Sequence, residues 1–301
     1  VANPSTDNVI VDQVSFTGFG QASVACGEDV LASGGLVIYQ CSSELRISAN
    51  AEPTDIHWTH VPGTARYAFD DNLSFGLPFR PTPFRAIFDV EFSSGRVSIE
   101  QPIEYRYADD IFAGEKRTAL IVVPQLAVEI TPEIVIIPGQ AKASQEVRVT
   151  VTNNGREPAT GEVTLEVPAG WTQTPDATTV RFNREDETRT VRFTVSPGVT
   201  TIGSYQVQAV VETPAGRFDR GYQVVEYPHI GRRHLVRSSQ ATFNVIDVAI
   251  EPNLTVGYVD GVGDAVPSSI EQLGAQVEHL DADALAWSDL SRYDVIVTGV
   301  R

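Results

Sequence analysis

Apolar and polar residues alternate most regularly in the middle of the chain. Valine occupies every second position of residues 147–151, and arginine or threonine fills the positions between them. This alternation predicts a β-strand with one buried face. The same pattern returns at residues 163–167, 191–195 and 205–211. Turn-forming residues such as Asn153-Asn154-Gly155 separate the runs. Closely spaced strands without a helical period between them are typical of an immunoglobulin-like β-sandwich, which we place at residues 126–227.

Another β-sandwich is predicted for residues 1–125. Short apolar runs lie there at residues 9–14, 35–40, 86–92 and 96–99. Ser93-Ser94-Gly95 predicts a hairpin turn between the last two runs. Residues 75–84 differ, because their three prolines fix backbone angles and remove amide donors, which excludes a central strand. We interpret them as an ordered loop. Its Phe75, Phe79 and Phe84 pack onto the module, and a ligand groove is the alternative.

Residues 228–250 are interpreted as a linker followed by a last strand at residues 241–245. The segment is basic in an otherwise acidic chain, with His229, Arg232, Arg233, His234 and Arg237. One interpretation is an anion site. The interpretation that we favour is a linker whose basic groups pair with acidic neighbours.

After Pro252 strands alternate with helices. Strands are predicted at residues 254–259, 276–280 and 293–298, and helices at residues 268–273 and 282–286. Pro267 is expected at the first helical position. This order indicates a doubly wound parallel sheet of the flavodoxin-like kind. Three strands leave an edge and much of a face uncovered, so residues 251–301 are predicted to be an incomplete α/β domain. The fold class is therefore mainly β, with two sandwiches and a truncated α/β segment.

The net charge of −17 bears on possible partners. A surface this acidic repels nucleic-acid phosphates and anionic lipid, so we expect neither as a partner. No apolar run approaches the roughly 20 residues that cross a bilayer, so membrane insertion is not expected. The chain begins at Val1 and has no methionine, which indicates a mature product or an excised piece.

Candidates for covalent or metal chemistry are few. Cys26 and Cys41 are too few for a disulfide framework or a four-thiolate zinc site. They form a disulfide if they lie on neighbouring strands of a secreted protein, and are otherwise two buried thiols. His57 and His60 are three positions apart, but a strand or loop would turn them apart, so no metal site is expected. The cluster Asp70-Asp71-Asn72 lacks the spacing and glycine of a calcium loop and is interpreted as a polar turn.

Candidates for ligand binding lie at a glycine pair and at the tryptophans. Gly261-Val262-Gly263 is half of a dinucleotide fingerprint, but Val266 stands where the third glycine belongs. We interpret this segment as a tight loop between a strand and a helix. Trp58, Trp171 and Trp287 are candidates for glycan contact, although Trp171 in a Pro-Ala-Gly-Trp turn suits packing better.

Several segments resemble the region downstream of the catalytic domain in large bacterial PIG-L (LmbE-like) deacetylase proteins. They include Gly76-Leu77-Pro78-Phe79 and residues 101–107, 168–171, 219–230, 256–259 and 289–294. Residues 126–227 also resemble the NEW3 (alpha-galactosidase-associated) sandwich. The final segment resembles the start of a glutamine-amidotransferase-like domain.

The resemblance implies a non-catalytic accessory region of a secreted or periplasmic, zinc-dependent N-acetyl-sugar deacetylase. The family's Ala-His-Pro-Asp-Asp signature and an amidotransferase cysteine elbow are not in the sequence, so we assign no catalytic residue. Zinc is expected only in the parent's deacetylase domain. The expected partners are the rest of the same polypeptide and a glycan. Alternatives are a stand-alone carbohydrate- or protein-binding sandwich, and an enzyme whose site lies on the α/β domain.

Overall fold

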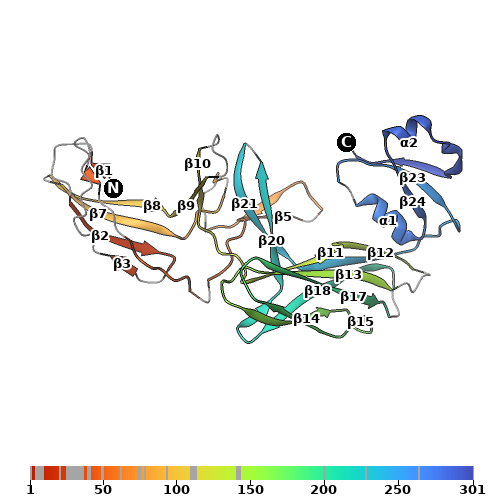
Figure 1. Cartoon of the computed structure of the whole chain (residues 1–301), viewed down its shortest axis with the longest axis horizontal. Helices are drawn as coiled ribbons and strands as arrows, with labels where there is room; N and C mark the ends of the chain where they lie inside the picture. The colour runs from red at the N-terminus through yellow and green to blue at the C-terminus, as the bar shows by residue number, and fades with distance from the viewer. Residues whose placement is uncertain are drawn as a thin grey trace. The chain divides into compact units, whose positions relative to one another are not determined.

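The computed structural model describes residues 2–3, 10–19, 22–24, 37–38, 42–48, 51–61, 63–72, 76–77, 79–92, 94–108, 114–139, 144–198, 201–227, 229–263 and 265–300. The chain forms two compact units. The first unit contains Val1–Val123 and Gln223–Val236, and the second contains Pro124–Tyr222 and Arg237–Arg301. Strands dominate both units (Figure 1).

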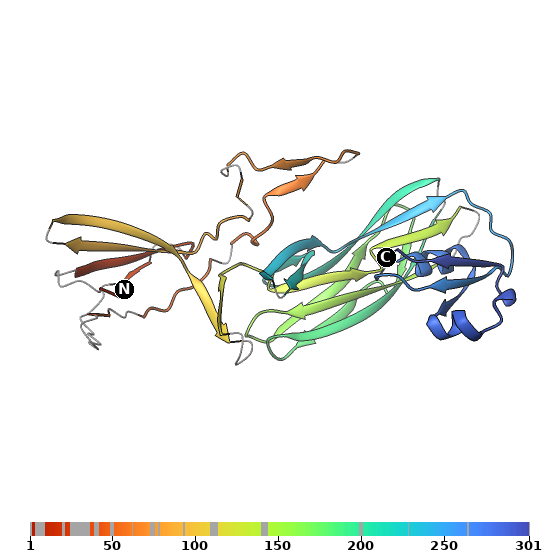
Figure 2. The ribbon, with the colours of Figure 1, turned by 90° about the horizontal axis from the view of Figure 1, so that it is seen from above.

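A four-stranded antiparallel sheet is the largest element of the first unit. Its strands, in spatial order, are β3 (Ala22–Val24), β2 (Ile10–Thr17), β7 (Arg85–Phe92) and β8 (Gly95–Pro102). β7 and β8 form the predicted hairpin, which lies along β2 (Figure 2).

Two-stranded ribbons make up the other described strands of this unit. β1 (Ala2–Asn3) pairs with β4 (Val37–Ile38), β5 (Trp58–His60) with β6 (Tyr67–Phe69), and β9 (Glu104–Ala108) with β10 (Glu115–Ala119). β20 (Arg220–Tyr227) pairs with β21 (Ile230–Ser238), and residues Gln223–Val236 of this pair belong to the first unit.

The buried core of the four-stranded sheet is small. Val11, Val14 and Ala86 are buried, and Phe16 and Phe88 pack against them. Every residue of β8 is exposed. In the described residues the unit is therefore one sheet with ribbons, where the sequence predicted two packed sheets. Alternation sets which face of a strand is buried but not which element covers it, so it does not distinguish these arrangements.

The second unit contains a β-sandwich. One sheet has the order β11 (Leu126–Thr131), β13 (Gln145–Asn153), β17 (Glu187–Ser196) and β15 (Thr172–Thr174). The other has the order β12 (Ile134–Pro138), β22 (Gln240–Ile246), β18 (Gly203–Thr213), β14 (Ala159–Glu166) and β16 (Thr178–Phe182), with β19 (Gly216–Phe218) paired to β18. The pair β12–β22 is parallel.

The sandwich core confirms the alternation read from the sequence. Val147, Val149 and Val151 are completely buried on β13, and they share one cluster with Phe193 and Phe243. Burying each such side chain contributes roughly 1.5–3 kcal/mol. The mainly β fold class with an immunoglobulin-like sandwich is confirmed.

β22 extends the sandwich beyond the predicted boundary at residue 227. It lies between β12 and β18, and its Ala241, Phe243 and Val245 are buried in the core. The strand itself was predicted, but in a separate segment at residues 228–250. β21 occupies much of the part of that segment that was interpreted as a linker.

The C-terminal segment forms a parallel sheet in the order β24 (Gln276–Leu280), β23 (Thr255–Val259) and β25 (Val295–Thr298). Helices α1 (Val266–Leu273) and α2 (Ala282–Trp287) and the 3-10 helix η1 (Leu290–Arg292) connect the strands. The predicted strand–helix alternation is confirmed. Pro267 is the second helical residue, because α1 begins at Val266. Among the described residues, no helix has the length and apolar character that crossing a membrane requires.

Candidate functional site

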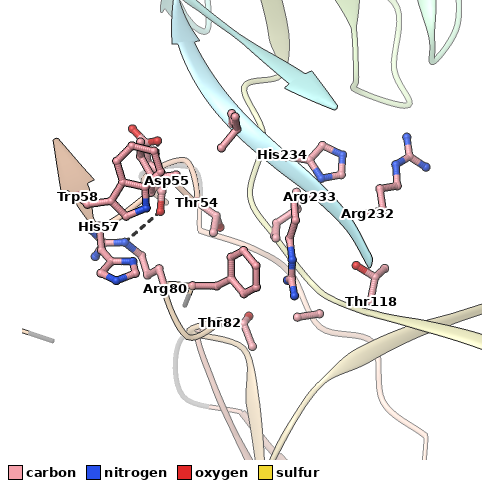
Figure 3. Close-up of a pocket in the computed structure, with 15 residues that line it drawn as sticks. Thr54, Asp55, His57, Trp58, Arg80, Thr82, Thr118, Arg232, Arg233 and His234 are labelled. Carbon is pink, nitrogen blue, oxygen red and sulfur yellow. Dashed lines mark hydrogen bonds between the residues drawn. The ribbon is translucent and has the colours of Figure 1, made fainter. Parts of the chain in front are cut away.

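A cavity of about 180 Å³ lies in the first unit (Figure 3). Its walls come from four segments that are distant in sequence, within residues 54–58, 79–82, 118–121 and 232–235. All four belong to the first unit. Three of them supplied candidates in the sequence, but no sequence pattern connected these candidates with one another.

Hydrogen bonds hold the walls of the cavity together. The Thr54 amide donates to the Val122 carbonyl, and the Val122 amide donates to Thr54 Oγ1, both at 2.9 Å. Thr82 Oγ1 donates to the Leu120 carbonyl at 2.7 Å. These contacts fix the first two segments to the third, which gives the cavity a defined frame.

Arg80 has a structural role at this frame. Its Nε donates to the Asp55 carbonyl oxygen at 3.1 Å (Figure 3), and its guanidinium forms an ion pair with Asp70. Asp70 therefore anchors Arg80, while Asp71 and Asn72 are exposed in a turn. This arrangement agrees with the interpretation of the acidic cluster as a polar turn.

His57 is a buried wall residue with an unused nitrogen. Its side chain is 3% exposed, and its Nε2 lies 3.1 Å from the Leu77 carbonyl oxygen. A carbonyl only accepts, so we assign the ring proton to Nε2. Nδ1 is buried without a hydrogen-bond partner. In the neutral ring Nδ1 is an acceptor, so it suits a donor such as a hydroxyl group.

The second histidine of the pair lies elsewhere. His60 is exposed, and its Nε2 lies 2.7 Å from the Thr64 carbonyl oxygen. The two histidines thus have different partners, as a strand predicts. Within the part of the chain that the structure describes, no three His, Cys, Asp or Glu residues gather closely enough to hold a metal ion.

Arg233 supplies a positive charge to the cavity. Its guanidinium carbon lies 3.7 Å from the centroid of the Phe79 ring. Its Nε is buried without a hydrogen-bond partner. Arg232 is exposed and also lines the cavity, although Figure 3 shows its side chain some way from that of Arg233. The basic stretch is therefore a strand whose arginines border a cavity.

The electrostatics of the same strand affect His234. Burial lowers the pKa of His234 below its ordinary value of 6.5, and the charge of Arg232 lowers it further, while Glu226 raises it in part. Burial and the charge of Arg232 both disfavour the protonated ring. His234 therefore stays neutral near pH 7.

Aromatic side chains also line the cavity. Trp58 is partly buried and meets the ring of Tyr67 edge-on at 5.2 Å. Phe79 is 46% exposed. Phe84 of the same proline-rich segment is fully buried and packs on Phe19, with ring centroids 4.6 Å apart. The segment thus uses one ring for packing and another for the cavity, while Phe75 lies outside the described residues.

Aromatic faces beside a guanidinium can hold a small ligand that has an apolar face and an anionic group. Sequence reasoning missed the wall residues Thr54, Arg80, Thr118 and Ile121. Their residue types carry no local pattern that points to a site.

Comparison with known families recognises a part of the second unit. Residues 137–213 match the family described as the NPCBM-associated, NEW3 domain of alpha-galactosidase. The sandwich of the second unit contains a NEW3 domain. β11 and β22, which lie outside the match, complete its two sheets. The description of the family links this domain to alpha-galactosidase, which is a glycoside hydrolase. Apart from residues 168–171, the segments that resemble deacetylase and amidotransferase proteins lie outside the match. The matched family is neither of these, so those two resemblances stay predictions.

Solved structures match parts of the chain at low sequence identity and low TM-score. The apo form of the Calx CBD1 domain shares 12% identity, with 41% of this chain and 100% of that chain covered and a TM-score of 0.25. A PapD-like domain of human CEP192 shares 12% identity over 40% of this chain and 87% of that chain, with a TM-score of 0.24. A family 123 glycoside hydrolase from Clostridium perfringens shares 9% identity over 45% of this chain and 30% of that chain, with a TM-score of 0.24. No curated protein matches the chain.

The other two tryptophans, Trp171 and Trp287, are not among the residues that line the cavity, and they differ in burial. Trp171 is a core residue of the sandwich, with its ring centroid 5.2 Å from that of Tyr205 and 5.4 Å from that of Phe243. It packs, as its turn motif predicts. Trp287 is 88% exposed on α2.

The glycine pair forms a tight loop after β23. A Cβ on Gly261 would lie 2.4 Å from the Val300 carbonyl oxygen, so only glycine fits without a backbone shift. The Val262 amide donates to the same oxygen at 2.9 Å. Val266 begins α1. These contacts favour the interpretation as a tight strand–helix loop.

Cys26 and Cys41 lie outside the described residues, so their pairing stays a prediction.

Proposed function

We propose that this chain is a non-catalytic accessory region of a larger carbohydrate-active protein, in which it positions the catalytic domain or contacts glycan. The observation that carries the proposal is the NEW3 domain at residues 137–213, a domain of the kind associated with glycoside hydrolases. The resemblance of the flanking segments supports a PIG-L-type, zinc-dependent N-acetyl-sugar deacetylase as the parent. Zinc then belongs to the parent's catalytic domain, and the protein is secreted or periplasmic.

The construction of the sandwich suits a scaffold. Asn153 is completely buried where β13 ends, and its Nδ2 donates to the carbonyls of Gly155, Glu157 and Arg184. Its Oδ1 accepts from the Gly155 amide at 3.1 Å. Polar groups satisfied in this way hold loops in one conformation. A rigid sandwich can keep neighbouring domains of one polypeptide apart or in a fixed orientation.

The accessory role is tested in the natural full-length protein. Acetate release is measured with N-acetylglucosamine and with a polymeric N-acetylated glycan, before and after deletion of this 301-residue region. We expect unchanged release from the monosaccharide and slower release from the polymer. The isolated chain should release no acetate. Acetate release by the isolated chain, or equal polymer rates with and without the region, would contradict the proposal.

The second candidate is a stand-alone carbohydrate-binding protein. The cavity with Trp58, Phe79 and Arg233 favours it, because a binding module needs a site of its own. The two candidates differ in the deletion experiment, since a stand-alone binder has no attached hydrolase whose rate could change.

A further inference from the structure

We infer that the cavity of the first unit binds one sugar unit that carries an anionic group, a carboxylate or a sulfate ester. Arg233 binds the anion, Trp58 and Phe79 contact the ring, and His57 accepts a hydrogen bond from a hydroxyl group. The choice of a sugar rests on the proposed carbohydrate-related function. The anionic preference rests on the cavity itself.

Arg233 is the first argument for an anion. The chain has a net charge of −17, and arginines such as Arg85, Arg217 and Arg292 pair with carboxylates. Among the described residues no carboxylate forms an ion pair with Arg233, and its Nε is buried without a partner. A guanidinium with an unused Nε donor beside a cavity favours a carboxylate or sulfate, which a guanidinium can bind through two parallel hydrogen bonds.

The other charges at the cavity agree with this preference. Arg232 adds a second positive charge. Arg80 is neutralised by its ion pair with Asp70. Asp55 is the acidic wall residue, and its Oδ1 accepts a hydrogen bond from the Ile56 amide at 2.7 Å. The arginines of β21 therefore leave the cavity with a positive potential that attracts anions.

The acceptor nitrogen of His57 favours a sugar acid over a simple anion. With its proton on Nε2, the buried Nδ1 can only accept a hydrogen bond. Carboxylates and sulfates are acceptors too, so they cannot satisfy this atom. A hydroxyl group can donate to it. Arg233 Nε and His57 Nδ1 are buried, unpartnered atoms of two residues that line the cavity. A ligand that carries both an anionic group and a hydroxyl group suits this pair of residues.

The aromatic rings and the volume set the size of the ligand. Trp58 and Phe79 offer flat apolar surfaces, which suit the C–H face of a sugar ring. The volume of about 180 Å³ is below the roughly 300–1,000 Å³ of sites for drug-sized ligands. A single sugar unit fits this size better than a longer oligosaccharide segment.

The experiment uses the whole chain labelled with 5-fluorotryptophan, whose three ¹⁹F resonances are assigned with single Trp→Phe variants. The probes are methyl glucuronide, glucose 6-sulfate, methyl glucoside, acetate and sulfate, and calorimetry gives the affinities. We expect the two acidic sugars to shift the Trp58 resonance and to leave those of Trp171 and Trp287 in place. Methyl glucoside should bind at least about tenfold more weakly, because it lacks a partner for the charged donors.

Variants test the roles of the wall residues. Arg233→Gln should weaken binding of the acidic sugars about tenfold and leave methyl glucoside unchanged. Arg233→Lys keeps the charge and should lose less. Arg66→Gln removes an exposed charge of the same unit at a residue that is not among those lining the cavity, and its affinities should match those of the unchanged chain. An unshifted Trp58 resonance in each variant without ligand confirms that the first unit is folded.

Four results would overturn the inference. They are the absence of a Trp58 shift with either acidic sugar, equal affinity for neutral and acidic sugars, equal losses in Arg233→Gln and Arg66→Gln, and binding of acetate or sulfate as tight as that of the acidic sugars. The last result would reduce the cavity to a site for small anions. None of the four changes the polymer-deletion result, so the accessory function and this inference can fail separately.

Discussion

The guanidinium carbon of Arg233 lies 3.7 Å from the centroid of the Phe79 ring. This contact joins β21 to the proline-rich segment at residues 75–84. It holds the arginine in one orientation, because a cation is attracted to the negative face of an aromatic ring. The contact therefore both stabilises the first unit and positions the charge that the cavity presents.

Removing the ring and the charge together tests this contact. In a double-mutant cycle with Phe79→Leu and Arg233→Gln, we expect a coupling free energy of about 0.5–1 kcal/mol. Urea unfolding followed by the ¹⁹F resonance of Trp58 measures it for the first unit. A cycle that replaces Arg233→Gln with Arg66→Gln is the control and should show no coupling. Equal coupling free energies in both cycles would mean that the loss of net charge, and not the contact between Arg233 and Phe79, causes the coupling.

Truncation of Phe243 tests whether β22 belongs to the sandwich. Phe243 is completely buried between the sheets, so Phe243→Ala should lower the free energy of unfolding of the second unit by about 3–5 kcal/mol. Thr242→Ala, at the neighbouring position on the other face, should cost much less. Urea unfolding followed by the Trp171 resonance gives both values. A small effect of Phe243→Ala would place residues 240–246 outside the core.

Asn153→Asp tests the buried amide where β13 ends. The carboxylate cannot donate to the Gly155, Glu157 and Arg184 carbonyls, so we expect a loss of about 3 kcal/mol in unfolding free energy. Asn183→Asp, at an exposed position of the same sandwich, should change it by less than about 0.5 kcal/mol. Chemical denaturation at pH 7 measures both variants. Similar losses of unfolding free energy in Asn153→Asp and Asn183→Asp would show that the added charge, and not the lost hydrogen bonds, lowers the stability.

The pKa of His234 predicts a pH dependence of the first unit's stability. Burial and the charge of Arg232 lower this pKa in the folded chain, in part opposed by Glu226. The unfolded chain then binds more protons once the pH falls below its own, higher pKa. Stability from this group is therefore present above the unfolded pKa near 6.5 and is lost as the pH falls towards the folded pKa.

His234→Gln isolates this effect from the other histidines. We expect the variant to lose less stability than the unchanged chain between pH 7 and pH 5, measured by urea unfolding with the Trp58 resonance. His229→Gln, an exposed histidine of the same unit, is the matched control and should keep the original slope. If His234→Gln also keeps that slope, another group is responsible for the pH dependence.

Local patterns of residues were enough to predict the strands and helices in much of the chain. The alternation at residues 147–151 predicted a strand with a buried face, and β13 has its valines completely buried there. The strand–helix order after Pro252 likewise appears as β23, α1, β24, α2 and β25. These features follow from residues that are near one another in the chain, because side-chain period depends on local backbone geometry. Trp171 was similarly predicted to pack from its turn motif.

Which segments lie next to one another became visible only in the three-dimensional fold. It placed β22 between β12 and β18, and it brought Trp58, Phe79 and Arg233 around one cavity. The proline-rich loop and the basic stretch were each visible in the sequence, and neither indicated the other. A period of two residues specifies the face that a strand buries but carries no information on its partner. Partners are chosen by the burial and hydrogen bonding of the whole chain, and for this reason the cavity could not be read from any single segment.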